Sequence, residues 1–187
     1  DLIAGDSTIR GIAIGGFSGS GIIVSSGGNH VEGNFLGVDV MGTTGNGNAV
    51  DGVAFGSGST STVNVVGGIH PRQANLISGN AAGVSITAIS IPGVNIEGNL
   101  IGTDINGSAA IPNTRSGVLI SSGAPKVVVG VRSGGAGNVI SGNGMHGIEI
   151  VGSDSGSGAV TIAGNRIGTS ASGVAALANG RYGIFID

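Results

Sequence analysis

Several residue types and patterns are missing or scarce in this chain, and each absence excludes a class of protein. The chain has no cysteine, which excludes disulfide frameworks and thiolate metal sites. Lysine and arginine number only 7 among 187 residues and the net charge is −3, so no basic patch suits nucleic acid. No apolar run approaches the roughly 18 residues of a membrane-spanning helix, so we expect no membrane insertion.

Glycine is the residue that is strongly over-represented. The chain has 41 glycines and only 4 prolines, and the glycines follow no three-residue period, which excludes a collagen-like helix. Hydrophobic residues make up 40% and charged residues 9%, the opposite of the balance found in disordered chains. The composition predicts a folded chain that buries apolar side chains and turns often.

One stretch recurs along the chain at a fixed period. Gly98–Asp104 reads GNLIGTD, and related text begins at Gly33 and Gly164, so the repeat is 65 or 66 residues long. Between these copies lies a second motif, which reads ANLISGN from Ala74 and GNVISGN from Gly137. Self-similarity at a fixed period is the sequence signature of repeat architectures.

The repeats are built from short strands with alternating apolar residues. A Gly-[Ile/Val]-x-apolar strand begins at residues 21, 52, 83, 117, 147 and 183, and two more short strands fit into each interval. This pattern predicts an all-β parallel β-helix with about five to six coils and three short strands per coil. Inward-pointing residues would stack on the next coil, about 4.8 Å away. An antiparallel β-sandwich would not show the same sequence motifs recurring in the same order.

Alternate coils differ in where they carry extra length. Three coils have a loop after the Asn-containing strand, over 39–51, 104–116 and 170–182. The other coils place their extra residues earlier, at 67–74 and 130–137. Insertions of this kind often line one face, commonly the binding face.

These motifs resemble the repeats of a known group. GNxIGTDxxGxxAxxN, followed by GVxI and alternating with GNxISGN, is similar to repeats of large secreted bacterial right-handed parallel β-helix proteins, relatives of the pectate-lyase-like superfamily. The resemblance covers nearly the whole chain. It implies a right-handed solenoid and an extracellular or cell-surface location. Because the chain begins at Asp1, we interpret residues 1–187 as a single domain that is a segment of a longer repeat protein.

Polar residues of the repeats have structural interpretations. Asn tolerates left-handed backbone and bonds neighbouring backbone groups, so one Asn per coil is expected at a corner, where the amides can form a hydrogen-bonded ladder. These residues are Asn34, Asn75, Asn99, Asn138 and Asn165. Asp39 and Asp104 each begin a stretch that fits a type I turn with Gly fourth, and Ser170 takes this place in the third copy. Their expected separation of roughly 10 Å leaves a catalytic role open, since inverting glycosidases hold carboxyls about 6.5–9.5 Å apart.

A few charged and aromatic residues fall in the loops and are glycan-contact candidates, with ordinary solvated loop residues as the default interpretation. They are His70, Arg72, Arg115, Arg132, Arg181 and Tyr182. We assign no catalytic residue, metal or cofactor. The calcium-binding β-helix nonapeptide needs Asp after Gly-Gly-x-Gly, but Gly134–Gly137 is followed by Asn138.

The sequence therefore favours a structural or adhesive solenoid segment of an exported bacterial surface or fibre protein, and not an enzyme. The alternative is a carbohydrate-active enzyme, a lyase or hydrolase acting on acidic glycans. Three or more acids and bases gathered on one face would favour the enzyme. Expected partners are a second copy, stacked head to tail through open solenoid ends, and surface glycans.

Overall fold

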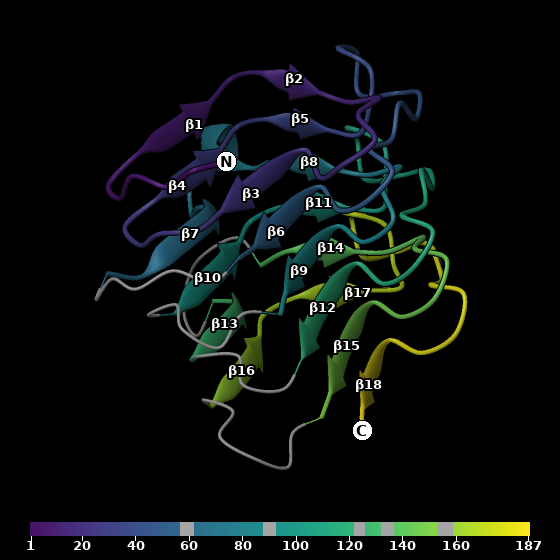
Figure 1. Cartoon of the computed structure of the whole chain (residues 1–187). Coiled ribbons are helices and arrows are strands. Elements are labelled where there is room, and N and C mark those ends of the chain that lie inside the picture. Colours follow the sequence, from purple (N-terminus) through teal and green to yellow (C-terminus); the bar gives the residue numbers. More distant parts are fainter. Residues whose placement is uncertain (57–61, 88–92, 122–125, 132–136, 153–158) are drawn as a thin grey trace.

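The chain forms a right-handed parallel β-helix with six coils and three strands per coil, as the repeat spacing predicted (Figure 1). This computed structural model describes residues 1–56, 62–87, 93–121, 126–131, 137–152 and 159–187. Each coil contributes one strand to each of three parallel sheets. The coils follow one another along the solenoid, from β1 at the top of Figure 1 to β18 at the bottom.

Each of the three sheets contains six strands. The first sheet contains β1 (Thr8–Arg10), β4 (His30–Glu32), β7 (Asn64–Gly67), β10 (Val94–Glu97), β13 (Val127–Gly130) and β16 (Val160–Ala163). The second contains β2 (Ala13–Ile14), β5 (Phe35–Leu36), β8 (Leu76–Ile77), β11 (Leu100–Ile101), β14 (Val139–Ile140) and β17 (Arg166–Ile167). The third contains β3 (Ile22–Val24), β6 (Val53–Phe55), β9 (Val84–Ile86), β12 (Val118–Ser121), β15 (Ile148–Val151) and β18 (Ile184–Ile186). A single 3-10 turn, η1 (Pro71–Gln73), is the one helical element in the described ranges.

The core is a set of apolar columns that run along the solenoid axis. Side chains alternate along each strand, so every second residue points inward. Parallel pairing in register then stacks each inward residue on the equivalent residue of the neighbouring coil. One column of the third sheet contains Val24, Phe55, Ile86, Ile120, Ile150 and Ile186. Ile86 is fully buried and Ile120 only 1% exposed, whereas Ile186, on the last coil, is 63% exposed. No coil buries its own apolar face, so each depends on its neighbours.

Alternate coils carry a hairpin between the second and third sheets, as the loop spacing predicted. The second, fourth and sixth coils each have an isolated antiparallel bridge there: Val38 with Gly45, Thr103 with Ala110, and Thr169 with Ala176. We call these the 39–44, 104–109 and 170–175 hairpins. The first, third and fifth coils pass directly from the second sheet to the third.

Candidate functional site

The predicted corner asparagines form a continuous ladder between the first and second sheets. Asn34 donates its backbone N–H and its Nδ2 to the Oδ1 of Asn75, at 3.0 and 3.1 Å. The same two bonds join each later pair through Asn99 and Asn138 to Asn165. Asn34, Asn75, Asn99 and Asn138 are at most 1% exposed. Their amides therefore join one coil to the next.

A second ladder, which the repeat spacing did not predict, lies between the second and third sheets. Its side-chain amides are joined in order along the coils by Nδ2–Oδ1 bonds of 2.9–3.2 Å. The members are Asn48, Asn80, Asn113, Asn143 and Asn179. The sequence does contain a spacing that could have predicted it. In the three coils that carry a hairpin, the ladder Asn comes nine residues after Asp39, Asp104 or Ser170.

Both ladders stop at the first coil, where apolar residues replace the asparagines. Ile12 and Phe17 donate only their backbone N–H, to Asn34 Oδ1 at 3.2 Å and Asn48 Oδ1 at 3.3 Å. The first coil therefore differs in chemistry from the five that follow.

The hairpin aspartates hold the turns that they begin. Asp104 Oδ1 accepts the backbone N–H groups of Ser108 and Ala109, at 2.7 and 3.0 Å. Asp39 Oδ1 accepts those of Thr43 and Thr44 in the same way, at 2.8 and 3.1 Å. Hydrogen bonds from the Thr43 and Thr44 backbone lower the pKa of Asp39. Burial raises the pKa of Asp104, but hydrogen bonds from Ala109 and Ser108 outweigh it and the net pKa is lowered. Both carboxylates are thus stabilised in the charged form, and each accepts hydrogen bonds from the backbone of its own turn.

Two of the glycan-contact candidates lie at the corner between the first and second sheets. His70 directly precedes η1 and Arg72 lies within it, and both are exposed. The His70 backbone N–H donates to Gln73 Oε1 at 3.2 Å. One acid at this corner, Glu32, accepts a 2.8 Å bond from Gln73 Nε2 and pairs with Arg10 at 3.5 Å. Its carboxylate is therefore already engaged.

Three other candidates gather at the corner between the second and third sheets. Arg115 and Arg181 belong to one backbone column, joined through Met145: Met145 N–H donates to Arg115 O and Arg181 N–H to Met145 O. Tyr182 follows Arg181 and is 58% exposed. The structure brings Arg115, Arg181 and Tyr182 to one corner and keeps them apart from His70 and Arg72. Arg132 lies outside the described residues.

An aromatic stack lies beside Arg181 and was not predicted. His146 and Tyr182 occupy the same place in consecutive coils, directly before Gly147 and Gly183, and their rings lie 5.4 Å apart and nearly parallel. Phe185 stacks on His146 at 4.9 Å. His146 is only 3% exposed, and its Nδ1 has no hydrogen-bond partner among the described residues.

Two serine–carboxylate hydrogen bonds cross coils on the outer side of the third sheet. Ser85 Oγ donates to Asp51 Oδ2, and Ser116 Oγ donates to Glu149 Oε2. Ser85 and Ser116 are at most 4% exposed, so these pairs are part of the packed structure.

Acidic and imidazole groups remain dispersed over the described part of the chain. Within it, no three His, Asp or Glu side chains lie close enough together to hold a metal ion. The described residues also contain no helix long and apolar enough to cross a membrane. No protein-family model, curated protein or solved structure matches this chain.

Proposed function

We propose that this chain is a structural solenoid segment of an exported bacterial surface or extracellular fibre protein. One observation carries the proposal: the buried polar side chains are used to join coils. Ten asparagines form two ladders that run along the axis, parallel to the stacked apolar core. Such a molecule lengthens by about 4.8 Å with each coil, which suits a spacer or fibre.

Export to the bacterial surface is supported by the repeated sequence motifs alone. The alternating GNxIGTD and GNxISGN motifs resemble those of secreted bacterial β-helix proteins, relatives of the pectate-lyase-like superfamily. Labelling intact bacteria that produce the protein with an antibody to this chain tests the location. We expect labelling of intact cells, and labelling only after permeabilisation would overturn the proposal.

An adhesive contact with glycans is favoured by the corner that holds Arg115, Arg181 and Tyr182. Two guanidinium groups suit carboxylates on an acidic glycan, and the exposed Tyr182 ring offers a flat apolar face. A glycan array probed with the chain and with an Arg115→Ser, Arg181→Ser double variant tests this role. Equal binding by both proteins would remove the corner from the proposal.

The enzymatic alternative has a direct test of its own. Incubating the chain with acidic polysaccharides and measuring new reducing ends and unsaturated uronates distinguishes a hydrolase, a lyase and an inactive protein. We expect neither product, and catalytic release of either product would replace the structural proposal with the enzymatic one.

A further inference from the structure

One asparagine of the chain stands in the sequence pattern that N-linked glycosylation uses. Asn106, Gly107 and Ser108 form Asn-x-Ser with a residue other than proline in the middle. No other asparagine of the chain stands two residues before a serine or threonine. Transferases that attach N-linked glycans recognise Asn-x-Ser or Asn-x-Thr on surface loops of secreted proteins. The pattern is therefore informative where the structure exposes it.

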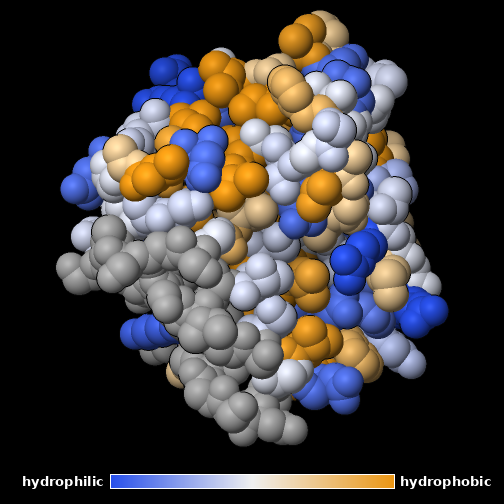
Figure 2. Space-filling model, in the orientation of Figure 1, coloured by the Kyte–Doolittle hydropathy of each residue, from blue (hydrophilic) through white to orange (hydrophobic). Residues whose placement is uncertain are grey.

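The structure places this pattern on the 104–109 hairpin of the fourth coil, with described coils on both sides. Gly107 N–H donates to Asp104 O at 2.9 Å, so Asn106 occupies the third position of a four-residue turn. Asn106 and Ser108 are both exposed. The hairpin projects from the corner between the second and third sheets, at the right of Figure 1, and Figure 2 shows hydrophilic residues at several levels along that side.

Asn106 differs from the ladder asparagines in having its amide at the surface. Asn99 and Asn113, for example, are at most 1% exposed, and their Nδ2 groups donate to the next coil. The Asn106 side chain instead hydrogen-bonds the Asp104 carboxylate, and Ser108 Oγ donates to Asp104 Oδ2 at 3.1 Å. One carboxylate thus holds the amide and the hydroxyl of the pattern together on an exposed turn.

The backbone of this hairpin is fixed on both sides without using the side chains of the pattern. Ile105 N–H donates to Gly42 O of the 39–44 hairpin at 2.9 Å. Ala171 N–H of the 170–175 hairpin donates to Gly107 O at 2.8 Å. The turn therefore has a defined shape, while the amide and the hydroxyl stay at the surface.

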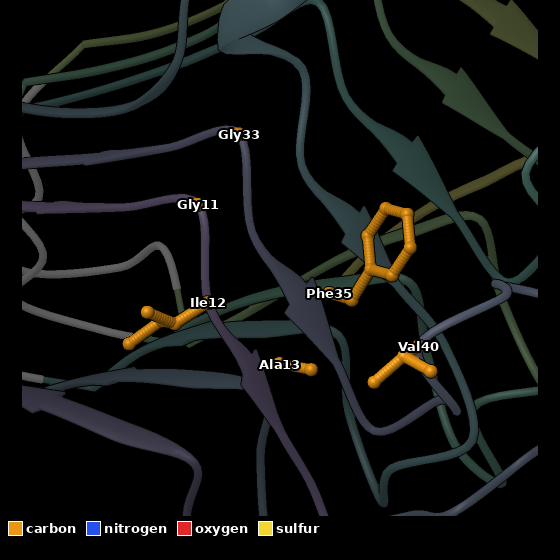
Figure 3. Close-up of a pocket in the computed structure, with 6 residues that line it drawn as sticks. All are labelled: Gly11, Ile12, Ala13, Gly33, Phe35 and Val40. Carbon is orange, nitrogen blue, oxygen red and sulfur yellow. The ribbon is translucent and has the colours of Figure 1, made fainter.

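The open pocket of the first two coils offers no comparable group. Its volume is about 240 Å³, and its lining residues are Gly11, Ile12, Ala13, Gly33, Phe35 and Val40 (Figure 3). None of these side chains contains nitrogen, oxygen or sulfur. The pocket therefore presents no side chain that a transferase could modify.

We propose that Asn106 is an N-glycosylation site that receives an oligosaccharide from a lipid-linked diphosphate donor. In this transfer Asn106 Nδ2 forms a bond to the anomeric carbon of the donor, and the bond from that carbon to the diphosphate oxygen breaks. The electron pair leaves with the lipid diphosphate, and the amide nitrogen releases one proton to the transferase. The inference rests on the export proposed above, because this pattern is used in secreted proteins. The glycan adds bulk and polar surface to the hairpins.

Transfer to the intact 187-residue chain tests the site. The chain is exported to the periplasm of bacteria that contain an oligosaccharyltransferase and a lipid-linked oligosaccharide, and the masses of the chain and of its peptides are measured. We expect one glycan, on the peptide that contains Asn106. Asn106→Gln and Ser108→Ala should each abolish it, and Ser108→Thr should retain it because threonine keeps the hydroxyl. Loss in Ser108→Ala is diagnostic, since the asparagine itself is still present.

The neighbouring hairpins provide matched variants that leave the original site intact. Met41 and Ser172 occupy the turn position of Asn106. Thr43 stands two residues after Met41, so Met41→Asn repeats the pattern and should add a second glycan. Val174 stands two residues after Ser172, so Ser172→Asn supplies the amide without the hydroxyl and should add none.

The outcomes separate this inference from the structural role. A natural chain that gains no glycan, or a glycan that persists in Asn106→Gln, would overturn the site. Either result would leave the structural role standing, because surface labelling of intact cells does not depend on glycosylation. Transfer at Asn106 together with labelling only after permeabilisation would overturn export and leave Asn106 as an acceptor.

Discussion

Asn75 and Asn99, on neighbouring coils, share two hydrogen bonds: the backbone N–H and the Nδ2 of Asn75 both donate to Asn99 Oδ1, at 3.1 and 2.8 Å. Asn99 Nδ2 in turn donates to Val66 O at 2.9 Å and to Asn138 Oδ1 at 3.0 Å. One amide thus bonds to coils on both sides.

Replacing Asn99 should therefore destabilise the solenoid strongly. Asn75 and Asn99 are both 1% exposed. Asn99→Ala removes the acceptor of the Asn75 backbone N–H and one of the two acceptors of Asn75 Nδ2, which keeps its bond to Val31 O. Leaving buried donors unpaired costs about 1–3 kcal/mol each, so we expect a loss of about 2–5 kcal/mol in urea unfolding. The exposed Asn106 gives a matched control, since Asn106→Ala should change stability by less than about 0.5 kcal/mol. Equal effects of the two substitutions would contradict a structural ladder.

The two ladders differ in how far the sequence could predict them. Asn34, Asn75 and Asn99 stand in one recurring motif directly before a strand, so their stacking follows from the period. In the second ladder, Asn80 comes three residues after Ile77 on a short coil, whereas Asn113 comes twelve after Ile101 because a hairpin intervenes. Stacking of these asparagines requires the hairpin to leave the coil and return to the same corner, which periodicity alone does not reveal.

The loop residues also differ in how far the sequence could predict their positions. Chain order already places His70 between the first and second sheets and Arg115 between the second and third, so their separation follows from the predicted coil. The stack of His146, Tyr182 and Phe185 depends on side-chain rotation across two coils, which no spacing rule specifies.

A second prediction concerns the left-handed corner at Gly102. Its φ is +87°, and a Cβ there would collide with Asn143 Oδ1 and Ser141 O of the next coil. Gly102→Ala should cost about 2–4 kcal/mol, from left-handed strain of about 1–2 kcal/mol and overpacking. Gly45→Ala is the matched control, because Gly45 lacks a positive φ and its nearest neighbour would be 3.5 Å away. Similar melting temperatures for the two variants would show that the corner can adapt.

The hairpin turns should weaken in acid. The pKa values of Asp39 and Asp104 are lowered in the folded chain, so their stabilisation is fully present above the ordinary value of about 3.9 and is lost as the pH falls through the lowered value. The amide resonances of Ser108 and Ala109, which donate to Asp104 Oδ1, should titrate with a midpoint below about 3.9. In Asp104→Asn the same amides should not titrate. A midpoint at or above the ordinary value would show that the turn does not favour the carboxylate.

The buried ring of His146 gives a prediction of increased stability. Its Nδ1 is buried without a hydrogen-bond partner in the described structure, while the ring lies 4.9 Å from Phe185 and 5.4 Å from Tyr182. An unpaired buried polar atom costs about 1–3 kcal/mol, and phenylalanine removes that atom but keeps a stacking ring. His146→Phe should therefore raise the free energy of unfolding by about 1 kcal/mol or more. His146→Ala, which loses the stack and leaves a cavity, should lower it by about 2–5 kcal/mol. Destabilisation by phenylalanine, measured beside the alanine variant in urea, would mean that the imidazole nitrogen is engaged in the folded chain.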